Sequence, residues 1–86
     1  SPRVVIEALG QGLPVLSTPV GSLPRCFIEK EEILFFPFND IKVAVEKIIY
    51  YSTKLDYLDK MRKNSYSKAK KEFTIEKFLG QVMHVE

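Results

Sequence analysis

GLPVLSTP, residues 12 to 19, encloses a mostly apolar run from Leu13 to Thr18 between a glycine and a proline. The run has the length and the β-prone composition of a short strand, and Pro14 is tolerable so close to its start. A second run, ILFF at residues 33 to 36, ends at Pro37. Strands that are apolar throughout are typical of parallel sheets covered by helices. The sequence therefore predicts two short, buried parallel strands.

Helical patterns surround both runs. Ser1-Pro2 predicts a helix start, because serine can cap a helix and proline is preorganised for its first position. The glycines of Gly10-Gln11-Gly12 end this helix. A short helical turn is expected from Pro24. Three further helices are expected, namely 41 to 52 capped by Asn39-Asp40, 54 to 73, and a last helix capped by Thr74.

Apolar spacing predicts which side of each later helix is buried. The helix at 41 to 52 carries an apolar stripe of Val45, Ile48 and Ile49. The helix at 54 to 73 has an inward line at spacings of three and four. Its members are Leu55, Leu58, Met61, Ser65, Ala69 and Phe73.

The alternation of helix and strand predicts an α/β architecture of the doubly wound type. Two strands alone do not make a stable parallel sheet, and the chain opens with a helix that no strand precedes. We therefore expect residues 1–86 to be the C-terminal portion of a Rossmann-like domain, with about two short parallel strands and three helices at its end.

Composition excludes several classes of protein. The 86 residues suffice for one small domain, and 45% hydrophobic residues are too many for a disordered segment. No apolar run approaches the roughly 20 residues that span a bilayer. Cys26 is the single cysteine, which excludes a disulfide framework and a thiolate metal cluster. A net charge of +2 is too small to indicate a nucleic-acid partner. A cytoplasmic setting fits best.

The charge is concentrated between Lys54 and Glu72. This segment holds seven basic and three acidic residues, a net charge of +4. A solvated helix face is the favoured interpretation. The alternative is weak contact with anionic lipid, but only Tyr57 and Tyr66 offer the rings that such helices place beside their basic face.

SPRVVIEALGQGLPVLSTPVGSLP, residues 1 to 24, resembles the signature of GT-B-fold retaining glycosyltransferases of the group 1, or family 4-like, type. That signature is close to E-G-F-G, four residues, E-A-M-A-x-G-x-P-V, and then G-G-x-P. The matching positions are Glu7-Ala8-Leu9, Gly12 to Val15, and Val20 to Pro24. ILFFPFND and Phe73-Thr74-Ile75-Glu76 are similar to later elements of the family. Ser22 replaces the second glycine, and the first glutamate would precede Ser1.

The resemblance implies a donor-binding role for five residues. Glu7 would accept hydrogen bonds from the ribose hydroxyls of a nucleotide-diphosphate sugar, for which a carboxylate is suited. The amides of Arg3 and Val4 would approach its phosphates, because a helix start attracts anions. Gly21 and Ser22 lie in a loop after a strand, where open α/β sheets place ligands. The alternatives are an exposed Glu7 beside Arg3 and a purely structural turn.

The resemblance also implies what this piece belongs to. Residues 1–86 would be a fragment of the donor-binding domain, with the N-terminal acceptor domain and the first half of the donor domain outside it. The parent enzyme would transfer a sugar to a glycan or lipid acceptor, without a bound metal or other cofactor. It would be cytoplasmic or peripheral at the inner face of the membrane. No catalytic residue is assigned here, and the fragment alone is expected to be inactive.

A different class of function also fits the residues. The chain could serve as a non-enzymatic α/β interaction module whose basic helix docks on an acidic surface.

Overall fold

The computed structural model describes residues 2–72, so the predicted Ser1 cap and the predicted helix from Thr74 lie outside the described residues. In this range the chain forms an α/β unit with four helices and two strands. The elements are α1 (Pro2–Gly10), β1 (Leu16–Ser17), α2 (Leu23–Cys26), β2 (Leu34–Phe35), α3 (Ile41–Ser52) and α4 (Leu55–Glu72). The α/β class predicted from the sequence is confirmed, and the arrangement is compatible with a fragment of a Rossmann-like domain.

The two strands pair in parallel, as predicted. Leu16 lies opposite Leu34 and Ser17 opposite Phe35. Each strand has two residues, which is shorter than the apolar runs predicted. The ladder continues only as far as the hydrogen bonds from Leu34 N to Val15 O and from Phe36 N to Ser17 O, each 3.0 Å long. Pro14 and Pro19 lie on either side of β1, and Pro37 follows β2. Proline contributes no N–H group, which limits the extension of the ladder.

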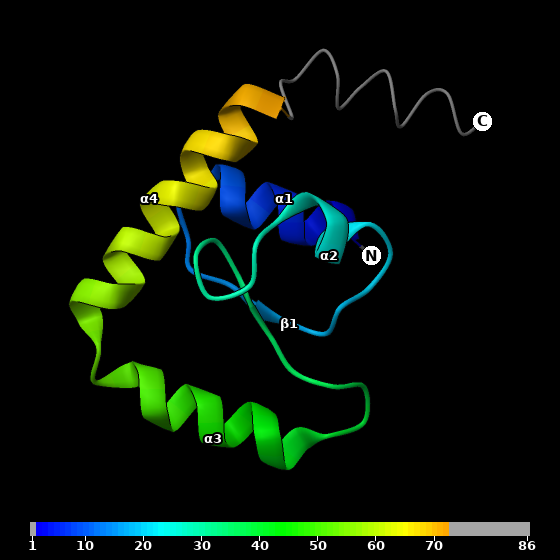
Figure 1. Cartoon of the computed structure of the whole chain (residues 1–86), viewed down its shortest axis with the longest axis vertical. Helices are drawn as coiled ribbons and strands as arrows, with labels where there is room; N and C mark the ends of the chain where they lie inside the picture. Colours follow the sequence, from blue (N-terminus) through cyan, green and yellow to red (C-terminus); the bar gives the residue numbers. More distant parts are fainter. Residues whose placement is uncertain (1, 73–86) are drawn as a thin grey trace.

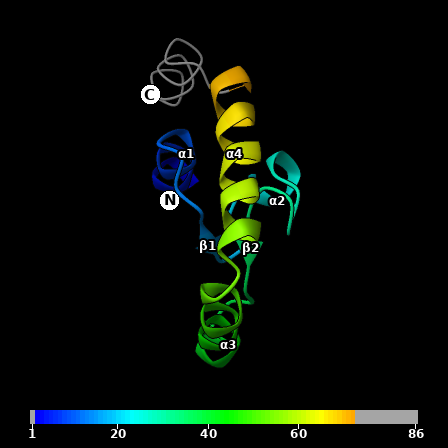
Figure 2. The ribbon, with the colours of Figure 1, turned by 90° about the vertical axis from the view of Figure 1, so that its left-hand side faces the viewer.

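The helices divide between the two sides of the strands. Figure 2 shows α1, α2 and α4 on one side and α3 on the other. The core lies on the side of α1, α2 and α4. Its buried members are Leu9, Leu23, Phe27, Ile33, Phe35 and Ala69. Because side chains alternate along a strand, Ile33 and Phe35 enter this core while Leu34 points to the side of α3.

The central part of the predicted inward line of α4 is confirmed. Met61, Ser65 and Ala69 are buried. The Ser65 hydroxyl lies 3.1 Å from the carbonyl oxygens of both Met61 and Arg62, so this buried polar group has partners within its own helix. Leu58 is half-buried. Phe73 lies outside the described residues.

Two predictions of burial are wrong. Leu55, at the start of α4, is 70% exposed. The stripe on α3 is also exposed, with Val45 at 46%, Ile48 at 58% and Ile49 at 65%. The reason is geometric: Ala44 is the buried residue of α3, and no side chains of residues 2–72 pack against Val45, Ile48 and Ile49 closely enough to bury them.

Two of the predicted helix boundaries follow known cap geometries. At the end of α1, Leu13 N donates to Ala8 O and Gly12 N to Leu9 O. These two bonds form a Schellman motif, which requires the left-handed conformation that Gly12 adopts at φ = 79°. At the start of α3, the Asp40 carboxylate accepts a 3.2 Å hydrogen bond from Val43 N, which confirms the predicted cap.

Candidate functional site

The carboxyl edge of the sheet gathers most of the predicted donor-binding residues. Because β1 and β2 are parallel, the loops that follow them, 18–22 and 36–40, leave from the same edge. Helix α1 precedes β1 and starts at that edge. Figure 1 shows the N-terminal end of α1 and both loops on the right-hand side of the view. Open α/β sheets bind ligands at this kind of edge.

The loop after β1 is held by its own backbone. Val20 N donates to Thr18 O at 2.8 Å, and Leu23 N donates to Val20 O at 3.2 Å. Gly21 is exposed and has a φ of 57°, a left-handed conformation that glycine adopts readily. Ser22 is half-buried and occupies the position before α2, although its side chain does not cap that helix. The loop thus presents the exposed backbone of Gly21 at the carboxyl edge.

The predicted residues of α1 face solvent. Arg3, Val4 and Glu7 are exposed, whereas Leu9 on the opposite side of the helix is fully buried. Arg3 and Val4 belong to the first turn, where helix geometry directs N–H groups outward along the axis. Glu7 lies one turn beyond Arg3 on the same face. An exposed Glu7 agrees with both interpretations of this residue, so ribose binding stays a prediction.

A tyrosine cluster lies at the corner between α3 and α4, near the amino edge of the sheet. The Tyr50 and Tyr51 rings meet edge to face with centroids 4.9 Å apart, and the Tyr51 and Tyr57 centroids are 5.3 Å apart. Lys54 Nζ lies 4.4 Å from the centroid of the Tyr50 ring. Sequence reasoning did not single out this cluster. The closely spaced tyrosines were its only signal.

Side chains of α4 clamp the loop 28–33 that leads into β2. The Tyr57 hydroxyl donates to Lys30 O, and Asn64 Nδ2 donates to Glu31 O at 3.1 Å. Lys68 Nζ lies 3.1 Å from the Glu32 carboxylate. Within this loop Lys30 has a φ of 73°, a left-handed conformation that is uncommon for a residue other than glycine. The fixed contacts around Lys30 hold the backbone in that conformation.

Part of the positive charge of α4 is neutralised within the helix. The Asp59 carboxylate lies 2.9 Å from Lys63 and 2.5 Å from Arg62. The pKa of Asp59 is lowered by its hydrogen bond with Lys63, which has the larger effect, and by its hydrogen bond with Arg62. Lys70 Nζ lies 5.5 Å from the centroid of the Tyr66 ring. These in-helix partners agree with a solvated face.

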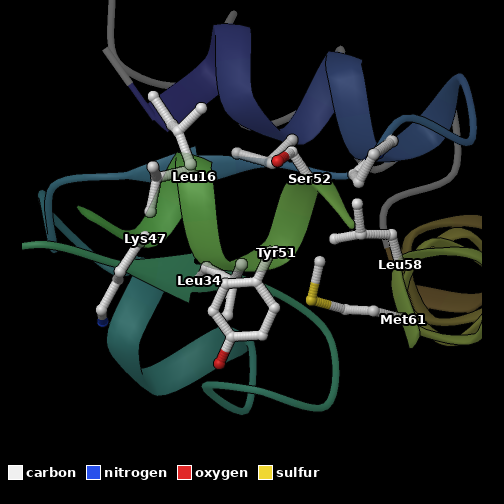
Figure 3. A pocket seen from close by; sticks show the side chains of 10 residues that line it. Leu16, Leu34, Lys47, Tyr51, Ser52, Leu58 and Met61 are labelled. Carbon is white, nitrogen blue, oxygen red and sulfur yellow. The ribbon is translucent and has the colours of Figure 1, made fainter. Parts of the chain in front are cut away.

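An apolar cavity of about 270 Å³ separates α3 from the strands and α4. Figure 3 shows Leu16 and Leu34 from the strands, Tyr51 from α3, and Leu58 and Met61 from α4 around it. The cavity lies on the same side of the sheet as the exposed stripe of α3, which marks this side as loosely packed.

Two further findings concern residues 2–72. None of the helices in this range combines the length and the apolar character that crossing a membrane requires. Within the same range, histidine, cysteine, aspartate and glutamate side chains do not gather in threes at a spacing suited to a metal ion.

Comparison with known proteins identifies a family and a relative. The sequence profile of a family described as "Glycosyl transferase-like" matches residues 1–84. The chain is also similar to the "Vi polysaccharide biosynthesis protein VipC/TviE" of Salmonella typhi, with 34% identity over 84 residues. That alignment covers 92% of this chain, and the chain spans only 14% of the relative. No solved structure gives a significant match.

Proposed function

The chain belongs to the family of glycosyl transferase-like proteins, and from this premise we propose that it forms part of an enzyme that transfers a sugar from a nucleotide-diphosphate sugar to an acceptor. The match over residues 1–84 carries the proposal. The similar protein from Salmonella typhi is named for polysaccharide biosynthesis, which favours a glycan or lipid-linked glycan as acceptor. The family assignment also disfavours a non-enzymatic interaction module.

We assign donor binding to the carboxyl edge of the sheet. The ribose would contact the Glu7 carboxylate, and the diphosphate would approach the amides of Arg3 and Val4 in the first turn of α1. Gly21 and Ser22 would line the other side of the donor. The exposure of Arg3, Val4, Glu7 and Gly21 supports this assignment, because a donor needs access to them. A GT-B fold with retention of anomeric configuration is part of the same proposal.

The chain is proposed to be one portion of the donor-binding domain. Parallel strands connected through a helix follow a right-handed path. Since α1 lies on the same side of the sheet as α2, a strand preceding α1 would pair with the free edge of β1 (Figure 2). The exposed stripe of α3 would then be covered by the same addition. An acceptor domain would complete the enzyme.

We propose that the enzyme is cytoplasmic and that contact of α4 with anionic lipid is at most weak. The basic side chains of α4 have aspartate and tyrosine partners within the helix. A membrane-binding helix normally places large apolar side chains beside its basic face, and α4 offers Tyr66 there.

The test is the substitution Glu7→Gln in the full-length protein. It keeps the size of the side chain and removes its charge. A hydrogen bond to a charged group is worth about 1.5–3 kcal/mol, so donor-nucleotide affinity should fall by roughly 10- to 100-fold. The fold should persist, because such a surface substitution changes stability by less than about 0.5 kcal/mol. Calorimetric titration with the nucleotide and thermal melting measure the two quantities.

The matched control is Asp56→Asn, which removes one carboxylate charge from an exposed position in the first turn of α4. This variant should bind the nucleotide as the wild type does. If Glu7→Gln also binds with unchanged affinity, Glu7 has no role in donor binding. A loss of stability with normal affinity per folded molecule would make Glu7 structural.

A further inference from the structure

Aromatic side chains are unevenly distributed over the chain. All four tyrosines belong to α3 and α4. Three of them form the cluster of Tyr50, Tyr51 and Tyr57, and Tyr66 lies two turns further along α4. Tyr50 is 58% exposed although its ring contacts Tyr51. The Tyr51 ring and Lys54 Nζ hold the Tyr50 ring in place, and its exposed remainder is a preformed flat surface with a polar tip.

Two cavities adjoin this cluster. One, of about 440 Å³, is lined by Tyr50 and Tyr51 of α3 together with Lys30. The other, of about 310 Å³, is lined by Tyr57, Lys60 and Asn64 of α4 and again by Lys30. Lys30 borders both cavities, so the two adjoin at this residue. We call the pair the tyrosine groove.

The walls of the tyrosine groove are fixed before any ligand arrives. Tyr57 and Asn64 donate hydrogen bonds to the carbonyl oxygens of Lys30 and Glu31. Lys30 is held in a left-handed conformation, and backbone strain of this kind tends to collect at functional sites. A preorganised surface loses little conformational entropy on binding, which favours the recognition of weakly binding ligands.

We propose that the tyrosine groove binds a segment of a glycan chain, at the opposite edge of the sheet from the proposed donor site. Sugar rings carry flat C–H faces, which pack on the Tyr50 and Tyr57 rings. Their hydroxyl groups pair with the donors and acceptors of Lys60 and Asn64 and with the Tyr57 tip. The choice of a glycan as the ligand rests on the proposed function in glycosyl transfer. Because the groove lies away from the proposed donor site, it would hold a growing glycan chain between successive transfers.

The test is affinity electrophoresis of the full-length protein through gels that contain either dextran, a neutral glucan, or polygalacturonate, an acidic glycan. Wild type should be retarded by at least one polymer. Tyr50→Ala should weaken the retardation by about tenfold, the equivalent of one aromatic contact. Tyr66→Ala is the matched control, because Tyr66 is a partly exposed tyrosine outside the groove. It should be retarded as the wild type is.

Nucleotide binding and thermal melting of the same variants separate this proposal from the proposed function. Tyr50→Ala should bind the donor nucleotide normally and melt as the wild type does. If wild type binds the nucleotide but neither polymer retards it, the groove proposal is overturned and the donor site stands. Glycan retardation without nucleotide binding would support the groove and overturn the donor site. A third outcome would also overturn the groove. If polygalacturonate retards Tyr50→Ala as strongly as the wild type, and added salt abolishes the retardation, then the binding is due to charge alone.

Discussion

The two sides of the β1–β2 pair differ in how completely this chain covers them. On the side of α1, α2 and α4, the side chains of Leu9, Leu23 and Ile33 are fully buried. On the side of α3, the buried residue of the helix is Ala44, and the stripe of Val45, Ile48 and Ile49 is between 46% and 65% exposed. The first side is a closed core, whereas the second leaves large apolar side chains exposed to solvent.

The difference has an energetic meaning. Burying a valine, leucine or isoleucine side chain stabilises a fold by roughly 1.5–3 kcal/mol relative to leaving it exposed. The exposed stripe of α3 comprises Val45, Ile48 and Ile49. Its burial against further chain would therefore stabilise the domain substantially. If the proposed additional chain covers this stripe, the stability of the protein is divided between contacts within residues 2–72 and contacts with that chain.

The largest expected effect concerns the side with the closed core. Phe27→Ala should lower the free energy of unfolding by about 3–5 kcal/mol, because the Phe27 ring is 2% exposed and its removal leaves a cavity. Phe38→Ala is the control, since Phe38 is 58% exposed and should cost about 0.5 kcal/mol or less. Urea unfolding of both variants measures the difference. Equal losses would mean that the side of α1 is not the core.

The second prediction concerns the side with the exposed stripe and depends on context. In residues 1–86 alone, Ile49→Ala should change the free energy of unfolding by about 0.5 kcal/mol or less, because Ile49 is 65% exposed. In the full-length protein, the same substitution should cost about 2–5 kcal/mol if the stripe is buried there. Urea unfolding in both contexts gives the two values. A small loss in the full-length protein would show that the stripe remains exposed.

The smallest expected effect is a change in the pH dependence of stability, and it concerns Tyr57 at the corner between α3 and α4. Burial, followed by the charge of Tyr51, raises the pKa of Tyr57 above its ordinary value of 10.0. The folded state then holds the phenol proton more tightly than the unfolded state. This contribution is fully present below about pH 10 and is lost as the pH rises through the raised pKa.

Melting temperatures measured across that alkaline range provide the test. They should fall less steeply for Tyr57→Phe than for the wild type, because the substitution removes the titrating group. Tyr66→Phe controls for the other ionisations of the protein and should follow the wild-type curve. Identical slopes for all three proteins would exclude a contribution from Tyr57.

Local chemistry made much of the fold predictable. Positive φ angles occur at the glycines Gly12 and Gly21, and the helix cap is provided by Asp40, as is typical of these residue types. The buried line of α4 was predicted from the spacing of Met61, Ser65 and Ala69. The exposure of Ile48 was not predictable, because an apolar stripe indicates where a helix would bury its side chains and not whether the partner is present. Lys30 gave no signal either, because tertiary contacts impose its left-handed conformation.

The candidate site was predictable in position but not in role. The parallel order of the strands puts Gly21 and the start of α1 at one edge, which the sequence pattern predicted. The role of Glu7 was not predictable, because ribose binding and a solvent-facing position beside Arg3 both require an exposed carboxylate. The tyrosine cluster escaped prediction because Tyr50, Tyr51 and Tyr57 come together only when α3 and α4 meet at their corner.

The packing of α1 against α4 also sets the order of events during synthesis. Leu9 and Ala69 share one core although they stand near opposite ends of the described chain. A ribosome adds about 5–20 residues per second, so roughly 3–12 s separate the synthesis of these two residues. During that interval Leu9, Leu23 and Phe27 lack the helix that covers them. The apolar side chains of α1 and α2 therefore remain without the cover of α4 for several seconds during synthesis.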